Sequence, residues 1–252
     1  MIEYKSVVLK CGGSVISDKD AICNVADVIK KLSKQYEIKA IVVSAMGKTT
    51  SELYDQARSI AGKMTKRELD TYLVTGEIQS AALLAMRLNA IGVPAHSYDA
   101  KSFGIITDDN FGNAKIKKIT MQHVCLLNGI PVVAGFQGVT EHGDFTTLGP
   151  EGSDITAVWI ATVMVADCCW LLKNGGGICD KNPKTNTDAR MFSEISYTKM
   201  LEILHENRGK SQVLHKRSVQ DARRFRKPLF VSSLENPSVG TLITAGVHSK
   251  VH

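Results

Sequence analysis

The sequence has 252 residues, of which 44% are hydrophobic and 22% are charged, and its formal net charge is +6. This composition is that of a globular protein with a substantial core, and it excludes a chain that is disordered along its length. The longest uncharged apolar run, Ile155 to Ala166, is too short to span a bilayer, and the first residues lack the apolar segment of a signal peptide. We therefore expect a cytoplasmic protein with no membrane partner.

Basic residues occur in small groups such as Lys30-Lys31 and Arg223-Arg224, without interleaved aromatic residues. Such groups are typical of solvated helix faces, so we expect no nucleic-acid partner, although the positive surplus suits a small anionic substrate. The six cysteines form no C-x-x-C pair, which favours reduced thiols over disulfides or a zinc site. We assign no residue as a metal ligand.

A short apolar run over residues 7–9 ends in Lys10 and then turns on Gly12, Gly13 and Ser14. A run that is rich in β-branched residues and bounded by glycine predicts a buried strand followed by a turn. Glycine amides at such a turn can approach a phosphate closely, which would place the lysine beside the transferable oxygens. The same residues also fit an ordinary strand and a glycine-rich turn without a ligand.

Apolar residues at helical spacing from Ile22 to Leu32, followed by an apolar run over 39–44, predict a βαβ unit with parallel strands. Residues 44–50 then form a second turn of small residues at the same edge of the sheet, which is where open parallel sheets bind ligands. Residues 51–88 are predicted to be mainly helical, with an interruption near Thr75–Glu77. Glu77 is either a residue that favours a helix start or a functional carboxylate.

A third turn, Leu148–Asp154, leads into an apolar helix over 155–165. Ser153 or Asp154 can cap that helix, or the turn can face phosphates. With no repeat or linker in the sequence, we expect one domain over 1–252 with two lobes, about 1–145 and about 146–252. The other predicted elements are strands at 95–98, 131–135, 169–172, 229–232 and 241–244, a hairpin over 136–147, and helices at 197–206 and about 218–226.

These stretches, taken in order, resemble the aspartokinase branch of the amino acid kinase family, across roughly Val7 to Thr244. Each motif is weak alone, but their number and order make the resemblance specific. The matching stretches are Lys10–Val15, Val42–Thr50, Thr75–Glu77 with Ser80–Leu84, Gly104–Asp108 with Gly112–Lys115, Pro131–Gly138, Thr146–Asp154 and Val213–His215.

The resemblance implies an α/β fold, a three-layer αβα sandwich around a mainly parallel eight-stranded sheet. It also implies transfer of the γ-phosphoryl group of Mg²⁺-ATP to the side-chain carboxylate of aspartate, with the acceptor in the first lobe, the nucleotide in the second, and a homodimer. By the same resemblance Lys10 and Asp154 are catalytic, and no histidine is needed as a strong base because the acceptor is already an anion. The implied nucleotide contacts are Lys10, Gly12, Gly13, Ser14, Gly152, Ser153, Lys173, Asn174, Lys184 and Gln212, and the implied acceptor contacts are Ser14, Thr49, Glu77 and Ser153.

The sequence departs from the family motifs at two places. Pro150 replaces the arginine of L-G-R-G-G-S-D that contacts the acceptor's α-carboxylate, and Glu151 adds a like charge. Residues 173–184 replace family residues on the nucleotide side, and Gln212 replaces a family lysine, a charge that Lys173 or Lys210 could supply instead. These departures leave two alternatives open, which are a kinase for another small acid and a non-catalytic homologue that binds a nucleotide, a metabolite or a partner subunit. The sequence ends where family members commonly continue into ACT domains, so we expect no feedback regulation through such domains within this polypeptide.

Overall fold

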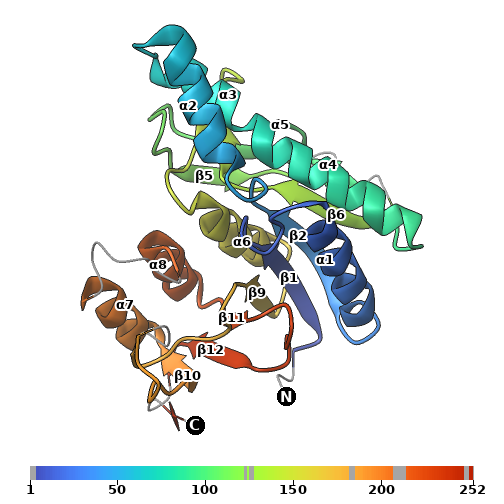
Figure 1. The fold of residues 1–252 in the computed structure, drawn as a ribbon, viewed down its shortest axis with the longest axis vertical. Helices are drawn as coiled ribbons and strands as arrows, with labels where there is room; N and C mark the ends of the chain where they lie inside the picture. Colours follow the sequence, from blue (N-terminus) through green and yellow to red (C-terminus); the bar gives the residue numbers. More distant parts are fainter. Residues whose placement is uncertain are drawn as a thin grey trace.

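The computed structural model describes residues 4–121, 124, 128–181, 185–206 and 214–246, and the backbone of 250–251. A nine-stranded sheet forms its centre (Figure 1). From one edge to the other its strands are β13 (Lys250–Val251), β10 (Phe192–Ser196), β12 (Gly240–Thr244), β11 (Leu229–Ser232), β9 (Cys168–Leu172), β1 (Ser6–Cys11), β2 (Glu37–Val43), β6 (Ile130–Ala134) and β3 (Ala95–Tyr98). All neighbouring pairs are parallel except β11–β12 and β10–β13. The predicted mainly parallel sheet is confirmed, with the two-residue β13 as an addition.

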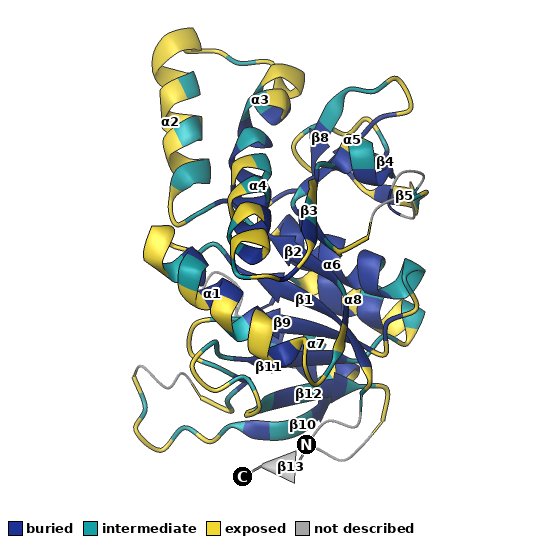
Figure 2. Cartoon of the chain, turned by 90° about the vertical axis from the view of Figure 1, so that its right-hand side faces the viewer, coloured by how far each residue is buried: buried dark blue, intermediate teal, exposed yellow. Residues whose placement is uncertain are grey.

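Each face of this sheet carries its own hydrophobic core, because alternate residues of a strand point to opposite faces. Val7 and Leu9 of β1 pack with the buried sides of α1 (Lys19–Leu32) and α4 (Thr75–Ala90). Val8 points the other way and packs with α6 (Gly152–Val163), α7 (Tyr197–Glu206) and α8 (Lys216–Phe225). Figure 2 shows buried strands between helices whose outer sides are exposed. This arrangement is the predicted three-layer αβα sandwich.

A second sheet of four strands packs on the α6 side of the molecule. Its order is β5 (Ile116–Ile119), β4 (Ile105–Thr107), β7 (Gln137–Val139) and β8 (Phe145–Thr147). Strands β7 and β8 form the predicted hairpin. Ile105 and Val139 bury their side chains in the same core as α6, so this sheet is fixed to the central one. The remaining helices are α2 (Thr49–Ala61), α3 (Lys66–Leu73) and α5 (Ala100–Phe103).

Strand β1 is buried along its whole length and is hydrogen-bonded to β2 on one side and β9 on the other. The three strands are parallel, and Lys10 lies opposite Val42 of β2 and Leu171 of β9. Their carboxyl ends therefore reach the same edge of the sheet. The first and second turns lie next to each other, as predicted, and the stretch from Lys173 lies beside them.

The predicted interruption near Thr75–Glu77 is confirmed, because α3 ends at Leu73 and α4 begins at Thr75, but a second break was not predicted. Residues 62–65 separate α2 from α3, and α4 begins at Thr75, so Thr75–Glu77 form its first turn. Val74 joins α3 to α4 and itself has right-handed helical dihedral angles, so this break is only one residue long. Among the described residues no helix is both long and apolar enough to cross a membrane.

Candidate active site

The first turn, after β1, is packed against the second turn, after β2. The Gly47 amide donates a hydrogen bond to the Gly13 carbonyl oxygen at 3.0 Å, and the Ser44 amide donates to the Cys11 carbonyl oxygen at 3.2 Å. A Cβ atom on residue 13 would lie only 2.6 Å from the carbonyl oxygen of Ala45. Glycine alone permits this approach, so the two turns form one continuous rim of backbone.

Lys10 and Lys173 both bind the carboxylate of Asp154. Lys10 Nζ lies 2.9 Å from Oδ1, and Lys173 Nζ lies 2.8 Å from Oδ2 and 3.1 Å from Oδ1. The exposed fractions of the three side chains are 5% for Lys10, 15% for Lys173 and 0% for Asp154. Because Lys10 lies on β1 and Lys173 directly follows the neighbouring parallel strand β9, the register of the sheet itself brings the two ammonium groups together.

Burial and ion pairing oppose each other in their effects on the pKa values of Asp154 and Lys10. Burial alone would raise the pKa of the Asp154 carboxyl, but the ammonium groups of Lys10 and Lys173 hold it well below its usual range. Burial lowers the pKa of Lys10, and Asp154 opposes that shift. Two ammonium groups against one carboxylate leave one positive charge in excess in a nearly dry place. Such an excess favours the binding of an anion, since charge-assisted hydrogen bonds are strong there.

The position of Asp154 is set by tight packing at the start of α6. A Cβ atom on Gly152 would lie 2.7 Å from the Cβ of Leu148, and a Cβ atom on Gly135 would lie 2.8 Å from the Cβ of Ser153. These two close contacts fix the first turn of α6, which carries Asp154. The third predicted turn thus joins the other two through the ion pair with Lys10. The N-terminal end of α6 adds its partial positive charge to the same region.

Pro150 and Glu151 lie beside this cluster and carry no cationic group. Glu151 has a left-handed backbone with φ of 56°, and its side chain does not cap α6. Burial raises the pKa of the Glu151 carboxyl, and Lys173 opposes that shift. Pro150 is exposed and has no N–H group to donate. This part of the loop is therefore acidic, in contrast to the two lysines next to it.

Glu77 is a second buried carboxyl group, with only 3% of the residue exposed. Its Oε1 accepts a hydrogen bond from the Ala45 amide at 3.1 Å, whereas Oε2 has no hydrogen-bond partner within the described ranges. Burial raises the pKa of Glu77 to about 8, and the Ala45 amide opposes that shift. Thr49 lies close by, since its Cγ2 would be 3.3 Å from a Cβ on Gly76. An unpaired buried oxygen of this kind is satisfied when a ligand brings a donor.

The remaining predicted residues are only partly placed. Asn174 lies against the first turn, because its Nδ2 donates to the carbonyl oxygen of Ser14 at 3.1 Å, and the Ser14 side chain is exposed. Lys184 and Gln212 lie outside the described residues. Gly12 adjoins the cluster, since a Cβ there would be 3.4 Å from Lys10 Nζ.

Two charged residues beside the site were not predicted. Asp70 on α3 and Arg217 on α8 each hold several loops through hydrogen bonds. The sequence contained a signal for their partners, because Gly112–Lys115 and Val213–His215 match family motifs, yet no role was assigned to either. Histidines were treated as structural or surface groups, and His215 does have a structural contact, since its Nδ1 accepts a hydrogen bond from the Arg217 amide at 3.0 Å.

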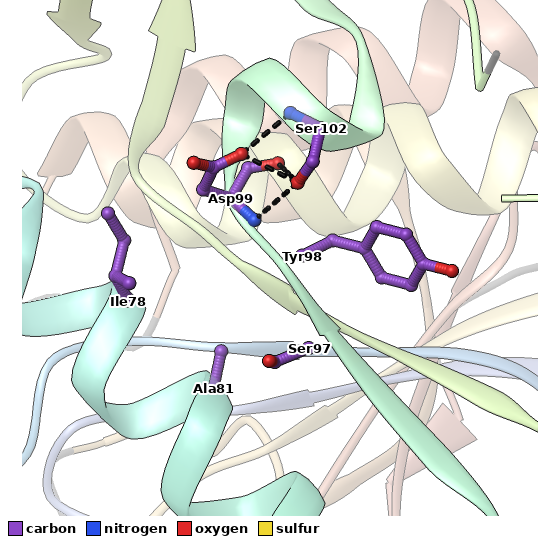
Figure 3. A pocket seen from close by; sticks show the side chains of 6 residues that line it. All are labelled: Ile78, Ala81, Ser97, Tyr98, Asp99 and Ser102. Atoms are coloured by element: carbon purple, nitrogen blue, oxygen red, sulfur yellow. Dashed lines mark hydrogen bonds between the residues drawn. The ribbon is translucent and has the colours of Figure 1, made fainter. Parts of the chain in front are cut away.

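A cavity of about 220 Å³ lies apart from the residues named above, between α4 and the end of β3 (Figure 3). Asp99 closes a capping box there, since its Oδ1 accepts hydrogen bonds from both the amide and the hydroxyl of Ser102. The cavity contains no predicted site residue. It is lined by Ile78, Ala81, Ser97, Tyr98, Asp99 and Ser102.

Comparison with known proteins agrees with this geometry. Residues 5–233 match the model of the amino acid kinase family. The chain belongs to this family. It is 42% identical to an aspartokinase of Geobacillus stearothermophilus, over 98% of this chain and 60% of that protein. The match to the family covers all three turns and both lysines of the cluster.

Solved structures show the same fold. The structure of aspartate kinase from Synechocystis superposes with a TM-score of 0.82 at 35% identity, over 98% of this chain and 41% of that one. E. coli aspartokinase III in complex with aspartate and ADP superposes with a TM-score of 0.83 over 96% of this chain and 65% of that one, and at 22% identity this likeness concerns the fold alone. The chain thus spans about 60% of the length of the curated aspartokinase it matches.

Proposed function

We propose that this protein is an aspartokinase-like phosphotransferase, which transfers the γ-phosphoryl group of ATP to the side-chain carboxylate of L-aspartate and releases 4-phospho-L-aspartate and ADP. The observation that carries the proposal is Asp154, fully buried and bound by both Lys10 and Lys173 at the rim formed by the glycine turns. The 42% identity with an aspartokinase supports the same reaction.

The lysine cluster suits phosphoryl transfer because that reaction asks a protein mainly for alignment and charge stabilisation. In our proposal Lys10 and Lys173 bind the oxygens of the transferring group, and Asp154 keeps both ammonium groups in place and charged. The amides of Gly12 and Gly13 and the start of α6, with Gly152 and Ser153, bind further phosphate oxygens. The acceptor carboxylate attacks as an anion, so no general base is required.

Lys173 gives the nucleotide side the second ammonium group that the change at Gln212 removes. The sequence alone left the source of this charge open, because the spacing between Lys173 and the other motifs does not show whether Lys173 reaches the site. The 2.8 Å contact with Asp154 supports Lys173 in that role. Asn174, next in the chain, then holds the first turn by its hydrogen bond to Ser14. Lys184 and Gln212 stay predicted nucleotide contacts.

Glu77, Ser14, Thr49 and Ser153 form the acceptor side of the proposal. The unpaired Oε2 of Glu77 would accept a hydrogen bond from the ammonium group of the amino acid, and that cation would hold the carboxyl in its charged form. Ser14 lies at the end of the first turn, and Thr49 lies near the end of the second turn, where α2 begins. The unpaired carboxylate oxygen of Glu77 would therefore favour an acceptor that carries an amine.

Mg²⁺ is expected to accompany the nucleotide. The described residues contain no group of three or more His, Cys, Asp or Glu side chains that could hold a metal ion, and both oxygens of Asp154 are bound by lysines. Mg²⁺ in kinases is commonly held by substrate phosphates with few protein ligands. When bound, it would neutralise charge on the phosphates.

The acidic loop at Pro150 and Glu151 favours a second candidate, an enzyme of the same mechanism with another small acid as acceptor. Pro150 cannot form a bidentate hydrogen bond with the α-carboxylate of an acceptor. Such a charged contact contributes about 1.5–3 kcal/mol to binding. Division into two lobes near residue 145 and assembly as a homodimer stay predictions.

Release of ADP, measured with Mg²⁺-ATP and a panel of amino and organic acids, tests the function. Aspartate should give the highest kcat/KM, and the hydroxamate of its phosphorylated product should form in equal amount. A higher kcat/KM with another acid would indicate that this acid is the acceptor. Absence of both nucleotide binding and turnover would favour the non-catalytic homologue. Lys34→Met, a change of an exposed lysine after α1, serves as the control for Lys10→Met.

A further inference from the structure

Arg217, in the first turn of α8, connects three parts of the chain that are far apart in sequence. Its Nη1 donates hydrogen bonds to the Leu148 carbonyl oxygen and to Asn113 Oδ1, each at 2.9 Å, and its Nη2 donates to the Ala114 carbonyl oxygen at 2.8 Å. These three hydrogen bonds of the guanidinium group all go to neutral oxygen atoms. Leu148 begins the loop that leads to Asp154, and Asn113 and Ala114 belong to the turn between β4 and β5.

Asp70, on α3, holds the other end of the same turn. Its Oδ2 accepts hydrogen bonds from the amides of Gly112 and Thr147, each at 2.8 Å, and its Oδ1 accepts from the Thr147 hydroxyl at 2.8 Å. Only 1% of Asp70 is exposed. Burial raises the pKa of Asp70, and the Gly112 and Thr147 amides oppose that shift. Asp70 is therefore a buried acid whose only role visible in the structure is to fix these loops.

The two residues act on adjacent positions of the same two segments. Asp70 binds Gly112 and Thr147, and Arg217 binds Asn113 and Leu148, each the next residue along the chain. We call this set the brace. It consists of Asp70, Gly112, Asn113, Ala114, Thr147, Leu148 and Arg217.

The brace joins the acceptor side of the site to the nucleotide side. Asp70 stands on α3, which leads through Val74 directly into α4 and Glu77. Arg217 stands on α8, which packs along α6 (Figure 1), where Trp159 Nε1 donates to Asp221 Oδ2 at 2.9 Å. Since Arg217 contacts residue 148 and Asp221 contacts residue 159, α6 and α8 run in the same direction. Their N-terminal ends therefore both point toward the site.

We propose that Arg217 and Asp70 are positioning residues, and that the brace sets the distance and angle between the acceptor held near Glu77 and the phosphoryl group held at Asp154. This inference rests on the proposed function, because it concerns the alignment of the two substrates. A displacement of about 1 Å in such an alignment can cost on the order of 100-fold in rate. The brace contacts neither Lys10 nor Lys173, so its loss acts on these two lysines only through the loop that leads from Leu148 to Asp154.

Arg217→Ala is the principal test, with Arg223→Ala as its matched control. Arg223 is an exposed arginine in the last turn of the same helix. We expect Arg217→Ala to lower kcat by about 10- to 100-fold while the dissociation constant of ADP changes less than threefold. Arg217→Lys should recover part of the loss, since an ammonium group can reach one or two of the three oxygens. Arg223→Ala should behave as the wild type.

Hydrogen exchange tests the brace without any turnover. Arg217→Ala should speed exchange at least tenfold in peptides covering 108–115 and 147–154, and not in β1 or β9. A double-mutant cycle with Asp70→Asn should be less than additive in kcat, because both residues hold the same two segments.

Unchanged kcat and unchanged exchange in Arg217→Ala would overturn the inference. So would a loss of kcat that comes with equal loss of ADP affinity and faster exchange throughout the sheet, because that pattern indicates general destabilisation. If the wild type transfers no phosphoryl group to any acceptor, the proposed function fails, and the exchange in the two loops still decides whether Arg217 orders them.

Discussion

Replacing Glu77 with glutamine removes a buried ionisable group while keeping the shape of the side chain and the acceptor for the Ala45 amide. In the folded protein the pKa of Glu77 is raised from 4.5 to about 8, so the folded state retains a proton that the unfolded state releases between these values. The stability contributed by this group is fully present below pH 4.5 and is lost as the pH rises through 8. The Glu77→Gln variant has no such loss.

The structure gives the size of the effect. A shift of one pKa unit corresponds to about 1.4 kcal/mol, so the shift at Glu77 corresponds to at most roughly 5 kcal/mol between pH 4.5 and 8. We expect Glu77→Gln and the wild type to have similar unfolding free energies near pH 4.5. At pH 8.5 the variant should be the more stable by several kcal/mol, on the order of that limit.

Urea unfolding at pH 4.5, 6.5 and 8.5 measures this difference, with Glu52→Gln, an exposed glutamate in the first turn of α2, as the control. In kinetic assays the variant should raise the KM for aspartate by about 10- to 150-fold, because a charged contact worth roughly 1.5–3 kcal/mol is lost. The KM for ATP should stay within twofold. A stability difference that does not change with pH would refute the reasoning, whatever the kinetics show.

Three further changes test the cluster and the turns. Lys10→Met should lower kcat by about 10³-fold or more, with little change in the urea midpoint because Asp154 keeps Lys173 as its partner; unchanged turnover would remove Lys10 from the mechanism. Lys173→Met should lower kcat by about 10²-fold and weaken the binding of ATP. An effect on the KM for aspartate alone would contradict the assignment of Lys173 as a nucleotide contact. Pro150→Arg should lower the KM for aspartate. The KM for succinate, an acceptor without the amine, is measured beside it. If neither KM changes, the loop at Pro150 does not contact the acceptor.

Much of the fold could be predicted because its strands are short, β-branched and bounded by glycine. The strands at residues 95–98 and 229–232 and the helix at 197–206 have the predicted bounds. Strand β10 was not predicted, since residues 192–196 alternate weakly and contain Ser193 and Glu194. Strands β4 and β5 were missed for a related reason, because three or four residues are too few to show a period.

The candidate site was likewise predictable only in part. Turns that follow parallel strands must meet at one edge of a sheet, so Lys10, Gly13 and Ala45 could be expected to lie together. The choice of Lys173 as partner of Asp154 depends on which strand neighbours β1, and that neighbour, β9, lies more than 150 residues away in the chain. Asp70 and Arg217 could not be found from local patterns, because the motif Gly112–Lys115 marks a partner loop but its backbone groups do not indicate which side chains bind them.

The hydrogen-bonded ladder between β1 and β9 limits how substrates can enter and leave. Lys10 and Lys173 belong to strands that are joined along five residue pairs from Val7–Cys168 to Cys11–Leu172. A bend of the central sheet between β1 and β9 would have to disturb that ladder inside the core. Under the proposed function, nucleotide exchange would therefore proceed by movement of peripheral parts, such as the exposed helix α2 and the glycines after Lys173, around the cluster of charges.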